Sequence, residues 1–183
     1  YFREGVHESA KHSWYEGKKP LHPYKGETVP EYTDFQDDGK YSWVKSPTFY
    51  GEPAQVGPLS WVLAWAAAKY EPGMRHLNRV IGIVESVAKT QIPLAALHST
   101  IGRHAARSVV CATMVDNLQQ QWQLLVDNIG SGDTKTFNRP EFPKGEVSGV
   151  GFHQAPRGVL SHWVVIKNGI IKNYQAVVPT TWN

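Results

Sequence analysis

The sequence GFHQAPRG at residues 151–158 and the sequence VVPTTWN at residues 177–183 decide how this chain is interpreted. The first contains a Pro-Arg-Gly turn, which fixes the backbone around Arg157, a residue that keeps its charge under all ordinary conditions. A fixed guanidinium beside a short hydroxyl, such as that of Thr180, can hold a small anionic ligand in an apolar pocket. The residue pattern by itself names no reaction.

Between these two stretches the sequence predicts a β-hairpin. Residues 163–166 and 170–174 flank Lys167-Asn168-Gly169, and the Asn-Gly step favours the positive φ angles of a two-residue turn. A hairpin brings the two ends of its segment together. We therefore expect the Arg157 turn and residues 178–180 to converge on one site.

Long helices are predicted for residues 58–130. Pro58 suits a first helical turn, and Gly130 with the polar residues after it is a strong stop signal. The expected helices run from Leu59 to Tyr70, from about Met74 to Thr90, and from Leu94 or Ser99 to Ile129.

The third of these helices is predicted to bury an apolar stripe. Cys111 is expected to be a buried structural thiol on this helix. Arg103 and Arg107 lie one turn apart and face either a carboxylate, a partner subunit or solvent. The stripe has near-helical spacing and consists of Ile101, Ala105, Val109, Ala112, Val115, Trp122, Leu125 and Ile129.

Residues 1–57 are predicted to be a loop-rich excursion that covers other structure. They are rich in Pro, Gly, Tyr and charge, with turn signals at residues 18–20 and 37–39 and a strand-like run at residues 41–44. Together with the helices and the hairpin they give an α+β fold that is mainly α. Its parts are a long-helix bundle, this excursion and a C-terminal β-hairpin that bears the site loop.

Composition and charge exclude several classes of protein. A chain of 183 residues normally folds as one domain, and 41% hydrophobic residues is ordinary for a globular protein. The net charge of +3 is too small to indicate nucleic-acid binding. Residues 59–68, the longest apolar candidate, have about half the length that spans a bilayer, so no transmembrane helix is predicted. If the protein sits at a membrane, a partner subunit must hold it there.

Five stretches resemble, in the same order, the large subunits of nickel–iron (NiFe) hydrogenases. The last of them is the most specific, because it is similar to the region that wraps the nickel–iron site of that family. The stretches are YFREGVHESAKHSWYEG (1–17), VGPLSWVLAW (56–65), HSTIGRHAARS (98–108), QWQLLVDNIGSGDT (121–134) and GVGFHQAPRGVLSHWVVIKNGIIKNYQAVVPTTWN (149–183). The resemblance implies that residues 1–183 are one segment of a hydrogenase large-subunit domain, made of residues 1–57, 58–130 and 131–183.

The cysteines that hold the metals in that family have no counterpart in this sequence. In the family, two CxxC pairs, one near each end of the large subunit, hold the nickel and the iron. This sequence has one cysteine, Cys111, and no cluster of histidines or carboxylates that offers a replacement. We therefore expect an internal or incomplete segment of a large subunit that lacks both pairs and cannot bind the nickel–iron centre alone.

The resemblance assigns roles around the two opening stretches. The iron of the family carries cyanide and carbon monoxide ligands, and Arg157 matches a catalytic arginine that would donate to a cyanide and assist proton movement. Pro156 and Val178 would shape the same pocket, and Thr180 would bond the other cyanide. On the residue pattern alone, Arg157 has a second interpretation, a buried arginine that caps a carboxylate or backbone carbonyls.

The remaining matches concern apolar contacts and a second metal. Leu160 and Pro179 match apolar residues around the carbon monoxide. Ala176 matches a position whose backbone carbonyl lies on a magnesium ion in relatives. One departure is Gln154, which stands where the family commonly has an acidic residue and so removes a charge near Arg157.

The resemblance implies an oxidoreductase that cleaves H2 reversibly into protons and electrons. Its expected partners are the remaining large-subunit segments and an iron–sulfur small subunit that carries the electrons away, with no nucleic acid. Residues 121–134 are more similar to the uptake branch, which is periplasmic or membrane-associated through partner subunits. Two other classes stay open: a non-catalytic hydrogenase-like scaffold subunit of a respiratory complex, and a helical binding module. The Pro-Arg-Gly and Val-Pro-Thr-Thr motifs argue against both.

Overall fold

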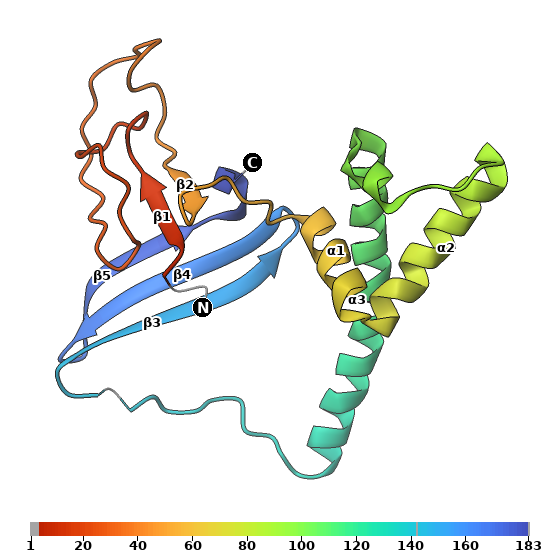
Figure 1. Cartoon of the computed structure of the whole chain (residues 1–183). Coiled ribbons are helices and arrows are strands. Elements are labelled where there is room, and N and C mark those ends of the chain that lie inside the picture. The colour runs from red at the N-terminus through yellow and green to blue at the C-terminus, as the bar shows by residue number, and fades with distance from the viewer. Residues whose placement is uncertain (1–3, 142, 183) are drawn as a thin grey trace. The chain divides into compact units, whose positions relative to one another are not determined.

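The computed structural model describes residues 4–141 and 143–182 of the chain (Figure 1). The chain divides into two compact units. The sheet unit consists of residues 1–57 and 141–183, and the helical unit consists of residues 58–140. The expected α+β class is confirmed: among the described residues, three α-helices lie in one unit and two small sheets in the other, with more residues in helices than in strands.

In the helical unit, the backbone conformation of the residues at the helix ends explains where the helices begin and end. The first helix ends at Ala68, two residues earlier than predicted. Lys69, the next residue, has a left-handed φ of 53°. The second helix was expected to begin at about Met74, but Glu71-Pro72-Gly73 already forms its first turn, where proline loses no hydrogen bond. The elements are α1 (Pro58–Ala68), α2 (Glu71–Ala88), the 3-10 helix η1 (Leu94–His98) and α3 (Thr100–Gly130).

The start of α3 is capped by Ser99. The Oγ atom of Ser99 accepts a hydrogen bond from the Gly102 amide at 3.0 Å. The two predicted starting points, Leu94 and Ser99, therefore mark two elements, η1 and then α3. None of the helices in the described part of the chain is long and apolar enough to cross a bilayer.

The core of the helical unit is small and lies where α1, α2, η1 and the first half of α3 meet. Its buried members are Leu59, Val62, Leu77, Leu97, Ala106, Val109 and Val110. From residue 118 to residue 130, α3 is exposed throughout. The prediction that the apolar stripe is buried is therefore wrong for Trp122, Leu125 and Ile129.

The buried face of α3 has a different phase from the predicted stripe. It consists of Gly102, Ala106, Val109, Val110 and Thr113, so that Val109 alone belongs to both sets. Cys111 is exposed rather than buried, which corrects the expectation of a structural thiol. At 3.6 residues per turn, Cys111 points away from a face centred near Val109 and Thr113. The remaining apolar residues of the predicted stripe are half-buried or exposed.

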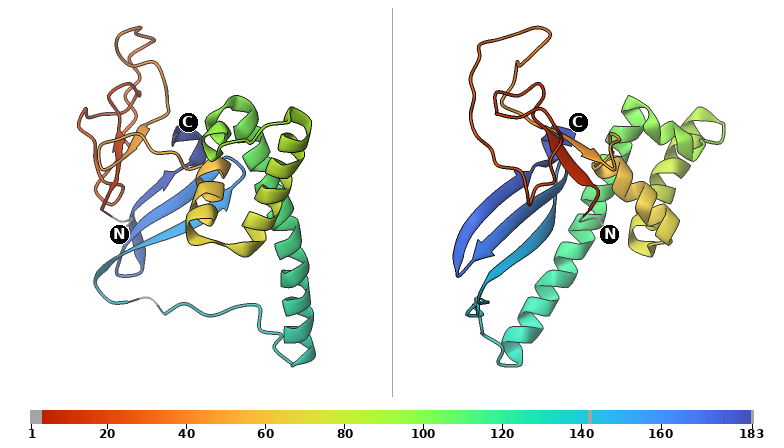
Figure 2. Two further views of the ribbon diagram at one scale, coloured as in Figure 1. Left: turned by 45° about the vertical axis from the view of Figure 1, so that its right-hand side comes forward. Right: turned by 60° about the vertical axis from the view of Figure 1, so that its left-hand side comes forward.

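The main sheet of the sheet unit is an antiparallel meander of three strands, β3 (Glu146–Ala155), β4 (Gly158–Lys167) and β5 (Ile170–Val177). Figure 2 shows these strands as one twisted layer. The predicted hairpin is present as β4 and β5, joined by Asn168 and Gly169 with φ angles of 52° and 80°. Strand β3 was not predicted.

A two-stranded ribbon precedes the helical unit in the chain. It pairs β1 (Val6–Ser9) with β2 (Ser46–Phe49) in antiparallel register. The strand-like run at residues 41–44 does not form a strand, and its Ser42 makes only an isolated bridge to Ser13. Residues 10–45 otherwise follow an irregular path, seen in Figure 1 as the loops above β1.

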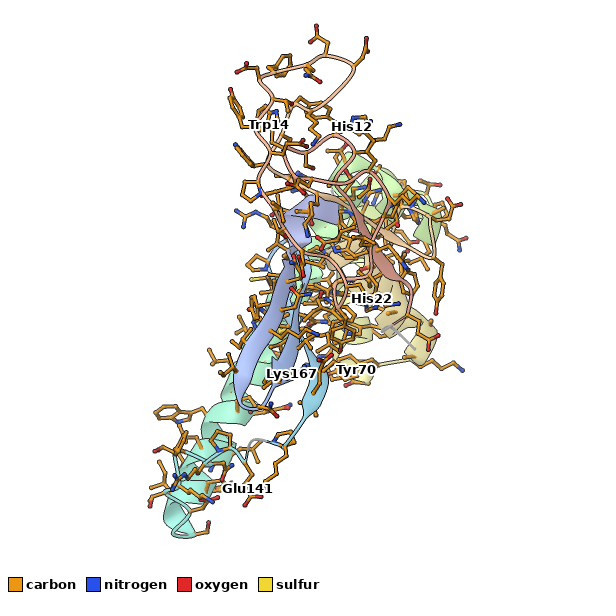
Figure 3. The ribbon with its side chains drawn as sticks, turned by 90° about the vertical axis from the view of Figure 1, so that its left-hand side faces the viewer. His12, Trp14, His22, Tyr70, Glu141 and Lys167 are labelled. Carbon is orange, nitrogen blue, oxygen red and sulfur yellow. The ribbon has the colours of Figure 1, made fainter. Side chains whose placement is uncertain are left out.

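The ribbon packs on one face of the three-stranded sheet through a second core. Trp163 of β4, Val177 of β5 and Val6 of β1 are each at most 2% exposed and form its centre. Tyr24 and His22, whose label lies beside the sheet in Figure 3, place their rings 5.0 and 5.1 Å from that of Trp163. Residues far apart in sequence thus share one apolar centre.

Two amides of β5 hold the N-terminal loop on the same face. Gln175 Nε2 donates to the Gly26 carbonyl at 2.7 Å, and Gln175 Oε1 accepts from Lys45 Nζ at 3.0 Å. Lys45 also forms an ion pair with the buried Glu8 at 2.7 Å. Asn173 Nδ2 lies 3.2 to 3.3 Å from the carbonyls of Pro23, Tyr24 and Gly26.

Candidate functional site

The turn between β3 and β4 carries Arg157. Ala155 pairs with Gly158 across this turn, so Pro156 and Arg157 are the two residues that connect the strands. Arg157 is exposed, and its guanidinium has no ion pair or hydrogen bond to any residue in the described ranges. The alternative of a buried, capping arginine does not apply within this part of the chain. The charge is thus available to a ligand.

The segment that follows β5 lies at the same end of the sheet as this turn. Val177, the last residue of β5, pairs with Ser161, which is close to the start of β4. Because β4 begins directly after the Arg157 turn, residues 178–180 continue from β5 toward that end. The two stretches that were expected to converge therefore lie at the same end of the sheet.

Most of the predicted site residues are exposed in the described chain. A ligand held by these residues alone would remain in contact with water, so a water-poor pocket needs cover from further protein. Exposed are Pro156, Arg157, Ala176, Val178 and Thr180, whereas Leu160 is half-buried and Pro179 is buried in the 3-10 helix η2 (Pro179–Trp182).

Ala176, the residue expected to offer a carbonyl to magnesium, lies on the sheet face opposite Trp163. It pairs with His162, whose Nδ1 atom is hydrogen-bonded to the Tyr174 hydroxyl. Within residues 4–141 and 143–182, no three His, Cys, Asp or Glu side chains are close enough to hold a metal ion. A single carbonyl does not make a magnesium site, which needs carboxylates or substrate oxygens as well.

Residues 56 and 57 contact the Arg157 turn, a contact that was not predicted. The Val159 amide donates to the Val56 carbonyl at 3.1 Å. Gly158 is buried with φ 144°, and a Cβ atom on it would lie 2.6 Å from the Val56 oxygen. The signal that was available is the glycine directly after Arg157, because a glycine in a strand indicates a close backbone approach.

The opposite end of the sheet has a hollow of about 440 Å³ between Tyr24, Glu146 and Asn173. Glu146 pairs with Lys167, which marks this end of the sheet in Figure 3. The hydrogen bond from Lys172, followed by the charges of Lys172 and Lys167, lowers the pKa of Glu146 below its usual value. This hollow is separate from the Arg157 end.

The comparison with known proteins identifies the family. The family model described as nickel-dependent hydrogenase matches residues 3–183. The chain belongs to the nickel-dependent hydrogenase family. The expected resemblance to hydrogenase large subunits is thereby confirmed.

Relatives within the family are similar over the whole chain. The Hydrogenase-2 large chain of Escherichia coli K12 is 52% identical over 184 residues, which cover 100% of this chain and 32% of that protein. The quinone-reactive Ni/Fe-hydrogenase large chain of Wolinella succinogenes is 39% identical over 197 residues, which cover 97% of this chain and 33% of that protein. The present chain thus spans about a third of the length of these relatives.

A solved structure shares the fold. The nickel–iron–selenium hydrogenase of Desulfomicrobium baculatum, in its H2-activated form, is similar with a TM-score of 0.76 and 25% sequence identity. The match covers 100% of this chain and 36% of that one. The arrangement of helices and strands described above is thus a segment of a hydrogenase fold.

The residues present do not fit the role of ligands to a nickel–iron group. Thiolates are the soft ligands that suit such metals, and the sequence contains only Cys111, on the exposed side of α3 in the helical unit. Arg157 and Thr180 instead offer N–H and O–H donors at one end of the sheet. This donor set fits hydrogen bonding around a metal group that other residues hold.

Proposed function

We propose that this chain is part of the catalytic large subunit of a nickel–iron hydrogenase, an enzyme that reversibly cleaves H2 into protons and electrons. The observation that carries the proposal is the 52% identity to the Hydrogenase-2 large chain of E. coli over the entire chain. Heterolytic cleavage of H2 is the chemistry that the nickel–iron group supplies when it is bound. The group would be held by cysteines outside these 183 residues, because this sequence has one cysteine.

Arg157 is the residue to which we assign a catalytic role. Its exposed guanidinium lies on the turn that the pair of Ala155 and Gly158 closes. It would donate to a cyanide ligand of the iron and keep a positive charge beside the place where protons leave. Thr180, at the same end of the sheet, would donate to the second cyanide. Donors fixed before the reaction need no reorganisation during it.

The other predicted residues would shape the surroundings of the same group. Pro156 and Val178 would line the pocket, and Leu160 and Pro179 would supply apolar contacts to carbon monoxide, which gains little from donors. The Ala176 carbonyl would contribute to a magnesium site completed by other ligands. These assignments follow from the matching motif positions.

The partners of the complete protein follow from the same family. We assign to it an iron–sulfur small subunit that receives the electrons, and large-subunit segments that cover the exposed Arg157 end. A quinone-reactive relative supports a place at the membrane or in the periplasm, reached through partner subunits. No nucleic-acid partner is assigned.

The test of this function is the Arg157→Lys variant in the complete hydrogenase. Lysine keeps the charge but lacks the planar fork of donors. We expect an unchanged nickel content by X-ray fluorescence and a loss of H2 oxidation of about 10²-fold, the usual effect of removing one such donor. Arg139→Lys, at an exposed position of the loop before β3, is the matched control and should keep full activity.

Two results would contradict the proposal. If the purified complete protein contains no nickel, it is a scaffold and not a hydrogenase. If Arg157→Lys is as active as Arg139→Lys at equal nickel content, Arg157 has no catalytic role, and the site must be sought elsewhere in the large subunit.

A further inference from the structure

The Arg157 turn is supported from outside its own hairpin. The ladder between β3 and β4 ends at the pair of Ala155 and Gly158, which leaves the turn beyond the last strand pair. Beside that last pair, the Val159 amide donates to the Val56 carbonyl at 3.1 Å. The backbone just before α1 therefore lies against the turn, and the two segments are distant in sequence.

Gly158 makes this contact possible in two ways. Its φ of 144° belongs to a region that side chains disfavour, and the residue is buried. A Cβ atom here would lie 2.6 Å from the Val56 oxygen and 2.9 Å from Val56 Cγ2, which are distances that real Cβ contacts do not reach. Any side chain would force Val56 and the turn apart.

The backbone at Gly57, next to Val56, lies close to the carbonyl of Arg157. A Cβ atom on Gly57 would lie 3.4 Å from the Arg157 oxygen. The peptide units on both sides of Gly158 are thus in contact with residues 56 and 57. The fixed φ of Pro156 restricts the turn from its other side.

We propose that Gly158 and the Val56–Gly57 backbone are positioning elements that fix the direction in which Arg157 leaves the turn. This inference rests on the proposed catalytic role of Arg157. The backbone conformation of this turn sets the point and the direction from which the long Arg157 side chain starts. A misplacement of about 1 Å can cost about 10²-fold in rate, which makes such support functionally significant.

The test uses Gly158→Ala in the complete hydrogenase, with Gly151→Ala as the matched control. Gly151 lies on β3 and has no positive φ, and a Cβ atom added to it would meet nothing beyond its chain neighbours within 4 Å. We expect Gly158→Ala to lower kcat for H2 oxidation by about tenfold or more at unchanged KM and nickel content. Amide hydrogen exchange of Val159 should become faster, because its bond to the Val56 carbonyl is lost. Gly151→Ala should change neither.

A double variant separates this inference from the proposed function. If Gly158 acts through Arg157, the variant carrying both Gly158→Ala and Arg157→Lys is no slower than Arg157→Lys alone. Independent, multiplying losses would overturn the positioning role. If Arg157→Lys alone is fully active, the proposed function of Arg157 has failed, whereas hydrogen exchange still decides whether Gly158 and Val56 fix the turn.

If the hydrogenase that carries Gly158→Ala does not assemble, a milder variant tests the same contact. Gly57→Ala would place a Cβ atom 3.4 Å from the Arg157 carbonyl oxygen, at the short end of ordinary van der Waals contact, so it crowds the turn only slightly. We expect a smaller loss of kcat in the same direction, with nickel retained. A Gly57→Ala enzyme with wild-type kcat and wild-type amide exchange at Val159 would overturn the proposal.

Discussion

At the scale of single residues, Trp163 is the centre of the sheet unit. It is 1% exposed, and its ring meets those of Tyr24 and His22 edge to face. Its indole N–H donates to Ser161 Oγ at 2.9 Å, two residues along the same strand face. A buried indole needs this acceptor, because an unpaired polar group in a core is costly.

Ser161→Ala tests that requirement. The variant leaves the Trp163 N–H without its acceptor, and we expect a loss of about 1 to 3 kcal/mol in the free energy that protects β4 from opening. Amide hydrogen exchange of β4 measures it. Ser148→Ala, at an exposed position of β3, should lose less than about 0.5 kcal/mol. Equal protection in the two variants would show that another acceptor serves Trp163.

Residue identities predicted turns better than they predicted burial. Asn168-Gly169 and the Arg157 turn were both found, because these residues act on their own backbone. Cys111 was misplaced, because burial depends on which neighbours reach a helix face. The contact of Gly158 with Val56 was missed for the same reason, since it joins distant segments.

At the scale of elements, α2 and α3 are joined by a charge cluster on Asp116. His76 Nε2 and Arg75 Nη2 lie 2.6 and 2.7 Å from the same Asp116 oxygen. The hydrogen bond with His76 lowers the pKa of Asp116 below the usual 3.8, and the charges of His76 and Arg75 lower it further. The charged carboxylate therefore favours the folded arrangement of the two helices.

Asp116→Asn should reveal this contribution through its pH dependence. A folded-state pKa below 3.8 gives stabilisation that is present above pH 3.8 and is lost as the pH falls through the folded-state value. We expect hydrogen exchange of α2 to be faster in the variant at about pH 6, with the difference from wild type fading below pH 3.8.

Asp127→Asn, at the exposed end of α3, is the control for that experiment. Its exchange should follow wild type at both pH values. A difference between Asp116→Asn and wild type that is the same at about pH 6 and below pH 3.8 would mean that the carboxylate charge is not what joins the helices.

Elements were predicted well where local signals are strong and poorly where glycines interrupt the pattern. The caps and prolines around α1, α2 and α3 located these helices within a few residues. Strand β3 was missed because Gly149 and Gly151 break its alternation and most of its residues are exposed. Its order comes from pairing with β4 along its whole length, and pairing partners are not visible in a local pattern.

At the scale of the whole molecule, the sheet unit is built from two segments that the helical unit separates in sequence. Asn173 and Gln175 of β5 hold the loop around Gly26, and Lys45 joins Gln175 to Glu8. A pattern taken along the chain cannot show that residues 1–57 and 141–183 share one unit. Only long-range contacts define it.

Gln175→Ala should release the N-terminal loop. The variant removes the bond to the Gly26 carbonyl and the acceptor of Lys45, so the loop opens more often. We expect trypsin to cleave after Lys25 about tenfold faster, as the loss of about 1.4 kcal/mol predicts. Gln154→Ala, an exposed β3 position, should be cleaved at the wild-type rate. Unchanged cleavage in Gln175→Ala would show that Asn173 suffices.

The bond between Gly26 and Gln175 spans 149 residues, and this separation has a consequence during synthesis. At about 5 to 20 residues per second, the nascent chain waits roughly 7 to 30 s between the emergence of these two residues from the ribosome. The helices between them have their contacts within reach much sooner. We expect residues 1–57 to reach their native state after the helices, although they are synthesised before them, and to depend meanwhile on chaperones.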